Sequence, residues 1–182
     1  MSPTVIARNR ASLTFAVLMT FLVVASAAAT EAHARKMPRC YGEVATIAPI
    51  KPNADVTGTD RRDVIVTGAG VNIIHSGGGN DVVCSGGSTD IVYSEDGGDR
   101  IHAGNDQDAV HGGEGKDFIW GYGGNDSLFG DEGSDMIDGG TGGGSIDGGD
   151  DNDFLYSGLG SSRISGGSGG DHIYGGPSPI TR

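Results

Sequence analysis

The chain has 182 residues, of which 35 are glycine and only 6 % are aromatic, and its formal net charge is −12. With so few large apolar side chains, a conventional globular core is excluded, so stability must come from the stacking of short repeated units. The acidic charge argues against a nucleic-acid partner, since binding to phosphates needs clustered Lys and Arg. Between residues 63 and 175, twenty Asp and Glu face only three Lys and Arg. We expect multivalent cations to neutralise this region.

Residues 1–29 are predicted to be a secretory signal peptide. Arg8 and Arg10 give a positively charged start, apolar residues follow from Leu13 to Val24, and small residues between positions 25 and 29 offer a cleavage site. An uncleaved membrane anchor is the alternative, although the apolar stretch is shorter than the ~20 residues of a membrane-spanning helix. The start lacks adjacent arginines, which argues against a twin-arginine signal. We therefore expect a secreted, extracellular protein without a membrane span after cleavage.

Residues 30–57 are expected to form an N-terminal linker and cap that precedes the repeats. Ile47 and Val56 share the nine-residue spacing of the repeats but lack their glycines and Asp, as is usual for terminal repeats. Cys40 and Cys84 are the only two cysteines. In an oxidising compartment we expect them to form a disulfide, and two free thiols are the alternative.

From residue 65 onward, an aliphatic side chain occupies every ninth position. The series is Ile65, Ile74, Val83, Val92, Ile101, Val110, Ile119, Leu128, Ile137, Ile146, Leu155, Ile164 and Ile173. Two residues before each stands a second series, the rungs, which are mostly acidic: Asp63, Asn72, Asp81, Asp90, Asp99, Asp108, Asp117, Asp126, Asp135, Gly144, Asp153, Ser162 and Asp171. Glycines precede the rungs and favour turns, because glycine reaches the required backbone conformations cheaply. Each repeat is therefore predicted to be a turn followed by a three-residue β-strand whose middle side chain points inward.

Residues 112–120 and 166–174 fit the pattern G-G-x-G-x-D-x-U-x completely, where U is aliphatic. This pattern resembles the RTX (repeats-in-toxin) nonapeptide, the hemolysin-type calcium-binding repeat. The resemblance implies an all-β fold, a right-handed parallel β-roll (a β-solenoid) with stacked 18-residue coils and two short-stranded parallel sheets. We expect this roll to span residues 58–176, with a C-terminal tail at residues 177–182. The resemblance also implies that several Ca²⁺ bind between neighbouring turns, through Asp carboxylates and backbone carbonyls.

Because two repeats make one coil, the rungs fall on two edges of the predicted roll. One edge is unbroken: Asp63, Asp81, Asp99, Asp117, Asp135, Asp153 and Asp171. The other is acidic only in its middle: Asn72, Asp90, Asp108, Asp126, Gly144 and Ser162. The predicted calcium ligands are the ten Asp rungs together with turn glycines that let carbonyl oxygens converge, namely Gly77, Gly79, Gly97, Gly113, Gly115, Gly133 and Gly169. Asp and Gly also favour turns that bind no metal, which is the alternative.

The turn glycine two residues before each rung refines this prediction. It is present before Asp81, Asp99, Asp117 and Asp135, and we expect the best calcium sites among these rungs. Asp106 and Asp151 replace it elsewhere, where they either add a ligand or distort the turn.

The outward side chains offer two further interpretations. His75, His102 and His111 are expected on the outer surface, and a zinc site is a weak alternative because His75 and His111 are two coils, about 10 Å, apart. Apolar side chains follow the unbroken edge at outward positions: Phe118, Trp120, Met136, Phe154, Tyr156 and Tyr174. They predict either a ladder that stabilises neighbouring strands or an exposed strip for self-association or a protein partner, through Phe118, Trp120, Phe154 and Tyr156.

No combination of nucleophile, base and oxyanion donor is recognisable, and short repeats leave no ordinary pocket, so we do not expect an enzyme. The expected function is that of a secreted calcium-binding repeat protein that folds when Ca²⁺ binds between its turns. The alternative is a calcium-dependent cell-surface adhesion or assembly module that uses the aromatic strip. An ice-binding roll is disfavoured, because Glu114, Thr141 and Leu159 share one outward loop position that regular Thr would occupy.

Overall fold

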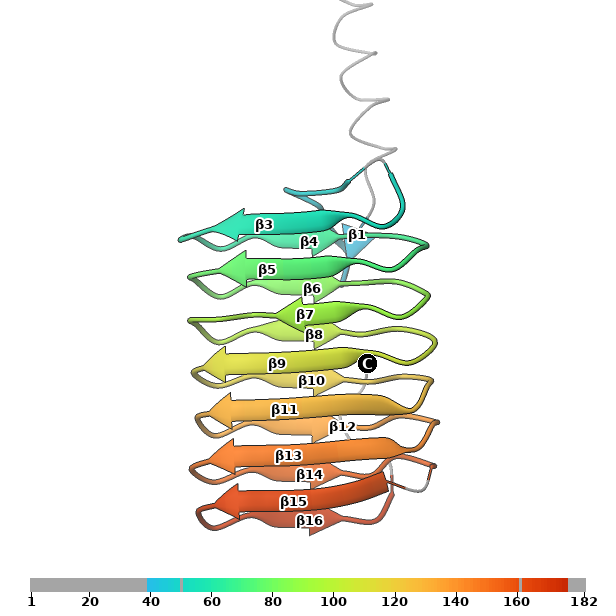
Figure 1. Cartoon of the computed structure of the whole chain (residues 1–182). Helices are drawn as coiled ribbons and strands as arrows, with labels where there is room; N and C mark the ends of the chain where they lie inside the picture. The colour runs from blue at the N-terminus through green and yellow to red at the C-terminus, as the bar shows by residue number, and fades with distance from the viewer. Residues whose placement is uncertain (1–38, 50, 161, 177–182) are drawn as a thin grey trace, which may run out of the picture. The chain divides into compact units, whose positions relative to one another are not determined.

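Short strands separated by turns follow one another along the computed structural model of the protein (Figure 1). The structure describes residues 39–49, 51–160 and 162–176. The predicted signal peptide, residues 1–29, and the predicted tail, residues 177–182, lie outside these described residues. Within the described ranges no helix is long and apolar enough to cross a membrane.

Two seven-stranded parallel sheets face each other, and the chain alternates between them. One sheet contains β4 (Val64–Val66), β6 (Val82–Cys84), β8 (Arg100–His102), β10 (Phe118–Trp120), β12 (Met136–Asp138), β14 (Phe154–Tyr156) and β16 (His172–Tyr174). The other contains β3 (Asp55–Thr59), β5 (Ile73–Gly77), β7 (Ile91–Tyr93), β9 (Ala109–Glu114), β11 (Asp126–Glu132), β13 (Gly144–Asp150) and β15 (Ser162–Ser168). Neighbouring strands pair residues 18 apart, as Ile101 with Ile119 and Val110 with Leu128. The predicted all-β solenoid of 18-residue coils is confirmed.

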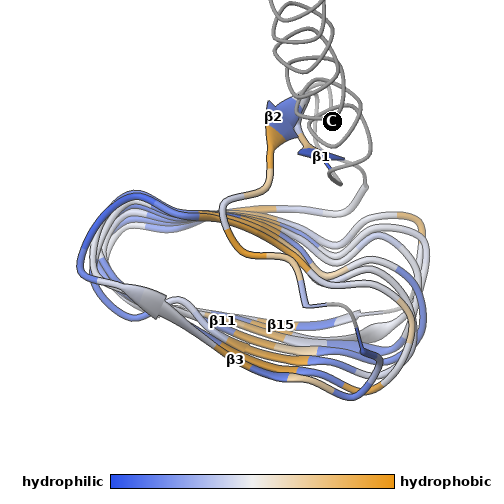
Figure 2. Cartoon of the chain, turned by 90° about the horizontal axis from the view of Figure 1, so that it is seen from above, coloured by the Kyte–Doolittle hydropathy of each residue, from blue (hydrophilic) through white to orange (hydrophobic). Residues whose placement is uncertain are grey.

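The aliphatic series forms the core between the sheets. From Ile65 to Leu155 its members are 0 to 3 % exposed and belong to one continuous cluster. Figure 2, which looks along the stack, shows hydrophobic residues on the strands of both sheets. Val56 joins this cluster and Ile47 pairs with Ile65, so the nine-residue spacing extends back to both positions. Each strand contributes only one side chain of this series to the space between the sheets, so the coils depend on one another for stability.

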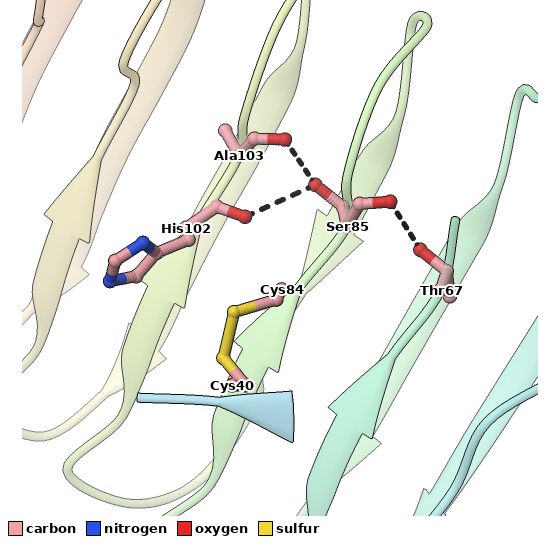
Figure 3. Close-up of a disulfide and its surroundings, with 6 residues drawn as sticks. All are labelled: Cys40, Thr67, Cys84, Ser85, His102 and Ala103. Atoms are coloured by element: carbon pink, nitrogen blue, oxygen red, sulfur yellow. Dashed lines mark hydrogen bonds between the residues drawn. A yellow bond between two sulfur atoms is a disulfide. The ribbon is translucent and has the colours of Figure 1, made fainter. Parts of the chain in front are cut away.

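A short hairpin covers part of the outer face of the β4–β16 sheet. It consists of β1 (Arg39–Cys40) and β2 (Glu43–Val44), which pair antiparallel. Cys40 forms the expected disulfide with Cys84 of β6 (Figure 3), with their Cα atoms 5.9 Å apart. Cys40 also packs against Val64 and Val82. The hairpin and the disulfide therefore bury outward side chains that the repeats alone would expose.

The hairpin also changes the predicted aromatic strip. Tyr41 places its ring 3.9 Å from that of His102 and 5.6 Å from that of Trp120, measured between centroids. Trp120 is consequently only 4 % exposed, and Tyr156, which stacks on Tyr174, is 8 % exposed. The prediction that Trp120 and Tyr156 belong to an exposed strip is wrong, because Tyr41 of the hairpin packs beside Trp120 and Tyr174 of the next coil stacks on Tyr156.

The core can be tested with two isoleucines that hold equivalent positions in the same sheet. Ile119 is fully buried, whereas Ile173 in the last coil is 51 % exposed. In calcium-containing buffer, Ile119→Ala should lower the free energy of unfolding by about 2–4 kcal/mol, because it leaves a cavity. Ile173→Ala should cost less than about 1 kcal/mol, since it removes less buried surface. Denaturant unfolding measures both values, and equal losses would contradict the described core.

Candidate metal centre

Each Asp rung is fixed by a hydrogen bond that crosses from one coil to the next. The backbone N–H of Asp99 donates to Oδ1 of Asp117 over 2.7 Å, and that of Asp117 donates to Oδ1 of Asp135 over 2.8 Å. The second edge has the same arrangement, as in the bond from the N–H of Asp90 to Oδ1 of Asp108. A longer side chain would overshoot this donor, so the contact explains why the rungs are Asp.

The second carboxylate oxygen of the rungs is buried and has no hydrogen-bond partner. This holds for Oδ2 of eight Asp, on the first edge Asp81, Asp99, Asp117, Asp135 and Asp153, and on the second Asp90, Asp108 and Asp126. An unpartnered buried carboxylate oxygen is costly, because the charge loses its hydration without compensation. These eight oxygens therefore need either a proton or a cation.

Burial also raises the pKa of these carboxyls. It raises the pKa of Asp99, Asp108 and Asp135 to about 8, although a backbone N–H bond to each opposes the shift. Neighbouring carboxylates add to it, as Asp117 and Asp81 do for Asp99. The pKa of Asp117 rises to about 7 and that of Asp126 to about 6, again chiefly through burial. Without a cation, ionised ladders would oppose folding at neutral pH.

Glycine at the start of the turn lets a carbonyl oxygen of the next coil approach the unpartnered carboxylate oxygen closely. A Cβ atom added at Gly121 would lie 2.6 Å from Oδ2 of Asp126 and 2.9 Å from the carbonyl oxygen of Gly139 in the next coil. A Cβ at Gly112 would likewise meet Oδ2 of Asp117 and a carbonyl of the next coil. A carboxylate oxygen and a carbonyl oxygen thus converge where no side chain intrudes. This all-oxygen donor set fits a hard cation such as Ca²⁺ and does not suit zinc.

Two further turn positions shape the backbone around each candidate site. The glycines predicted to bind the metal all have φ between +94° and +140°, which favours glycine: Gly77, Gly79, Gly97, Gly113, Gly115, Gly133 and Gly169. Two residues before the rung, three turns have another residue in place of glycine: Ser88, Asp106 and Asp151 adopt φ of 77°, 74° and 75°. The backbone of these three turns therefore keeps the left-handed conformation. Oδ2 of Asp106 accepts a hydrogen bond from the N–H of Ser88.

The comparison with protein families addresses this repeated turn directly. The family model for the RTX calcium-binding nonapeptide repeat (4 copies) matches residues 57–92, 85–119, 111–146, 129–163 and 147–177. The chain belongs to this RTX family. Comparison with curated proteins and comparison with solved structures gave no match. The protein is therefore a calcium-binding repeat protein with a β-roll, and the Asp rungs and turn glycines remain the predicted ligands of its RTX turns.

The first RTX rungs differ from those in the middle of the roll. Asp63 accepts hydrogen bonds at Oδ1 from the Thr46 hydroxyl and at Oδ2 from the backbone N–H and hydroxyl of Thr59. Asn72 donates to Oδ1 of Asp90 and to the carbonyl of Gly70. The side chains of both rungs are thus satisfied by hydrogen bonds to other groups of the protein. The repeat pattern does not show that Thr46 and Thr59 would cap Asp63, because Thr46 precedes the repeats and Thr59 replaces the second glycine of the nonapeptide.

The last rung lies at the open end of the described roll. Asp171 accepts a hydrogen bond from the N–H of Asp153 over 3.1 Å but is only partly buried. A Cβ at Gly166 would meet its Oδ2, as at the turns before it. Asp171 therefore keeps the geometry of an RTX rung with more access to water.

The histidines take part in other contacts. His75 lies 2.9 Å from Glu95 and His111 lies 3.1 Å from Asp131, both through Nδ1, while the ring of His102 packs against Tyr41. Across residues 39–176, leaving aside positions 50 and 161, no three His, Cys, Asp or Glu side chains gather as a metal cluster.

Two rungs on the same edge test this assignment. Asp117→Asn keeps the acceptor for the Asp99 N–H but removes the charge beside Gly112, so it should reduce the bound Ca²⁺ by at least one ion per chain. Asp63→Asn is the matched control and should leave the amount of bound Ca²⁺ unchanged, because Thr46 and Thr59 already donate hydrogen bonds to both carboxylate oxygens of Asp63. Equilibrium dialysis with calcium analysis measures both, and an equal loss in the two variants would refute the distinction.

The raised pKa values predict how stability depends on pH in calcium-free buffer. The folded state favours protonated Asp, whereas an unfolded Asp titrates near ~3.9. The stabilisation is therefore complete below about pH 4 and is lost as pH rises through the folded pKa values of about 6 for Asp126 and about 8 for Asp99. Urea unfolding should show a falling free energy across this range, and Ca²⁺ should reverse the fall. A free energy that rises with pH in calcium-free buffer would count against buried, unpaired rungs.

Proposed function

We propose that the protein is secreted, binds several Ca²⁺ between successive RTX turns, and completes its folding when they bind. The observation that carries this proposal is the set of eight buried, unpartnered Asp Oδ2 atoms, five on one edge and three on the other. Ca²⁺ at these turns would neutralise carboxylates that otherwise repel one another from coil to coil. Binding free energy then becomes folding free energy, as in other small metal-dependent domains.

The proposed secretion determines where calcium binding and folding would take place. Residues 1–29 have the pattern of a signal peptide. Extracellular calcium modules bind at about 10⁻⁴ to 10⁻³ M, well above the calcium concentration of a cytoplasm. The chain would therefore stay incompletely folded before export and fold outside. The Cys40–Cys84 disulfide is consistent with an oxidising compartment.

We further propose that the roll is not an enzyme. The carboxyls with raised pKa values lie in the two ladders, where their Oδ1 atoms are held by backbone N–H groups of the preceding coil. Their Oδ2 atoms face the interior of the turns, so they are placed for a cation and not for a substrate in a cleft.

A second candidate function is calcium-dependent adhesion or self-assembly. The observation that favours it is a remaining aromatic surface on the last two coils. Phe154 and Tyr174 are 38 % and 43 % exposed, and they stack on His172 and Tyr156 respectively. Such planar side chains are suited to contact a partner.

A calcium titration of the chelator-treated protein tests the leading proposal. Trp120 is the only tryptophan and is buried in β10, so its fluorescence reports on the middle coil. We expect β-sheet circular dichroism to increase and Trp120 emission to shift to the blue as Ca²⁺ rises through about 10⁻⁴ to 10⁻³ M. Mg²⁺ at equal concentration is the control and should have a smaller effect, because it demands octahedral geometry and retains its water.

The same samples separate the two candidates. A complete β-sheet signal in excess chelator would overturn coupled folding. Molar mass by light scattering should stay that of one chain if the protein is a solitary calcium binder. A mass that doubles or more with Ca²⁺, and returns to one chain in Phe154→Ser, would favour assembly instead.

A further inference from the structure

The hairpin of β1 and β2 has two unfavourable features where it meets the roll. The turn between its strands consists of Tyr41 and Gly42, with φ of 50° and 80°. This left-handed conformation suits glycine but is strained for tyrosine. The Tyr41 hydroxyl is also buried without a hydrogen-bond partner, which is costly because its contact with water is lost without replacement. The hairpin therefore needs other contacts to keep it on the sheet.

The non-covalent contacts that oppose these costs are modest. The Tyr41 ring packs edge-on against the His102 ring, with 3.9 Å between centroids, and the Arg100 guanidinium lies 3.9 Å from the centre of the Tyr41 ring. The ion pair between Glu43 and Arg62 spans 2.6 Å, but both side chains are exposed, so it contributes little. Each strand of the hairpin has only two residues, and a hairpin so short is not stable by itself. The disulfide is consequently its main anchor.

The chain is attached to the roll again directly after the hairpin. The backbone N–H groups of Thr46 and Ile47 both donate to the carbonyl of Val64, over 2.8 and 3.1 Å. The Thr46 hydroxyl also donates to Asp63. These hydrogen bonds belong to the first coil and do not involve the disulfide. Without the disulfide, movement of the hairpin would therefore stop at Ala45 and leave the coils in place.

The two cysteines of the disulfide differ in how they can be reached. Cys40 is 1 % exposed and packs against Val64 and Val82. Cys84 is partly exposed and pairs with His102 on the neighbouring strand (Figure 3). A surface pocket of about 200 Å³ opens here, lined by Cys84, Gly86, His102, Gly104, Asn105 and Tyr122. Ordinary ligand pockets measure ~300 Å³ or more, so this one suits a small molecule that approaches the disulfide from the side of Cys84.

We propose that Cys84 is a site of exchange with small thiols, and that exchange there releases the hairpin, which acts as a cover. A thiol in the pocket attacks the Cys84 sulfur as its thiolate and forms a disulfide with it, while the bond to Cys40 breaks and Cys40 leaves as a thiolate. The second thiol of a dithiol reductant then attacks this mixed disulfide and releases Cys84. The dithiol is oxidised to a disulfide, and the protein gains two electrons and two protons as two cysteine thiols.

Cleavage of the disulfide and opening of the hairpin are coupled through Cys40. Its thiolate forms among apolar side chains, where a charge is unfavourable. Movement of the hairpin into water hydrates this sulfur, gives the Tyr41 hydroxyl a hydrogen-bond partner and relaxes the Tyr41 backbone. The covered surface includes the Trp120 ring, which is 4 % exposed and lies 5.6 Å from the Tyr41 ring. Reduction therefore uncovers aromatic side chains without unfolding the coils.

Reduction with dithiothreitol in calcium-containing buffer tests this proposal. Hydrogen exchange followed by mass spectrometry should show that amides of residues 39–45 exchange at least about tenfold faster after reduction, because the hairpin has left the sheet. Amides of residues 46–176 should stay within about threefold, because the hydrogen bonds between coils persist. Trp120 emission should shift to the red. The Ca²⁺ bound per chain should not change, since Thr46 still donates to Asp63.

Two variants separate release of the hairpin from loss of one aromatic ring. The double variant Cys40→Ser, Cys84→Ser should have an open hairpin without reductant, and dithiothreitol should change neither its exchange nor its emission. Tyr41→Asn is the matched control, because Asn followed by glycine suits the left-handed turn and the disulfide stays intact. It should shift Trp120 emission to the red while residues 39–45 keep their protection.

Free cysteine, a monothiol small enough for the pocket, identifies the attacked sulfur. After acid quenching, peptide mapping should find the cysteine adduct on Cys84 and a free thiol at Cys40. An adduct on Cys40 would overturn Cys84 as the site of exchange. Unchanged protection of the hairpin and unchanged Trp120 emission after complete reduction would overturn its role as a cover. Loss of protection throughout the coils would overturn the conclusion that opening stops at Ala45.

Discussion

The hydrogen bond from the backbone N–H of one rung to Oδ1 of the Asp one coil later is the contact on which the rest of the roll depends. It joins residues 18 apart, as at Asp99 and Asp117, and so matches the register of the paired strands. Because Oδ1 is occupied by the backbone, Oδ2 is left facing the interior of the turn. The same side chain therefore sets the stacking of the coils and creates the need for a cation. A substitution that removes both carboxylate oxygens therefore disturbs the stacking of the coils and the binding site together.

The repeated part of the fold could be predicted because its spacing is strict. The resemblance to the RTX nonapeptide implies that a side chain returning every nine residues alternates between two sheets, and the inward row from Ile65 to Leu155 is buried accordingly. The separation of the Asp rungs into two edges follows from the same arithmetic and agrees with the coil-to-coil bonds on each edge. The Gly-rich turns could be predicted too, because left-handed φ values recur at the same places.

The non-repeated part could not be predicted in this way. Cys40 and Cys84 indicate a cross-link, but not that β1 and β2 would lie on the outer face of one sheet and bring Tyr41 against Trp120. The capping of Asp63 by Thr46 and Thr59 depends on two side chains that depart from the nonapeptide pattern. Ser76, five residues before rung Asp81, is visible in the sequence. Its hydrogen bond to the carbonyl of Ser94 in the next coil can be recognised only once the side chain is known to point inward. Positions that are equally spaced in the sequence therefore lie in different structural environments.

The disulfide has a mechanical consequence. Cys40 precedes β3 in the chain, and Cys84 ends β6. Tension that enters the roll from residues before Cys40 therefore passes through the sulfur–sulfur bond directly into β6. Strands β3, β4 and β5 lie within the closed covalent loop and carry none of that load. If the protein is ever pulled at its N-terminal side, its first coils cannot be peeled off, and yielding must begin beyond Cys84.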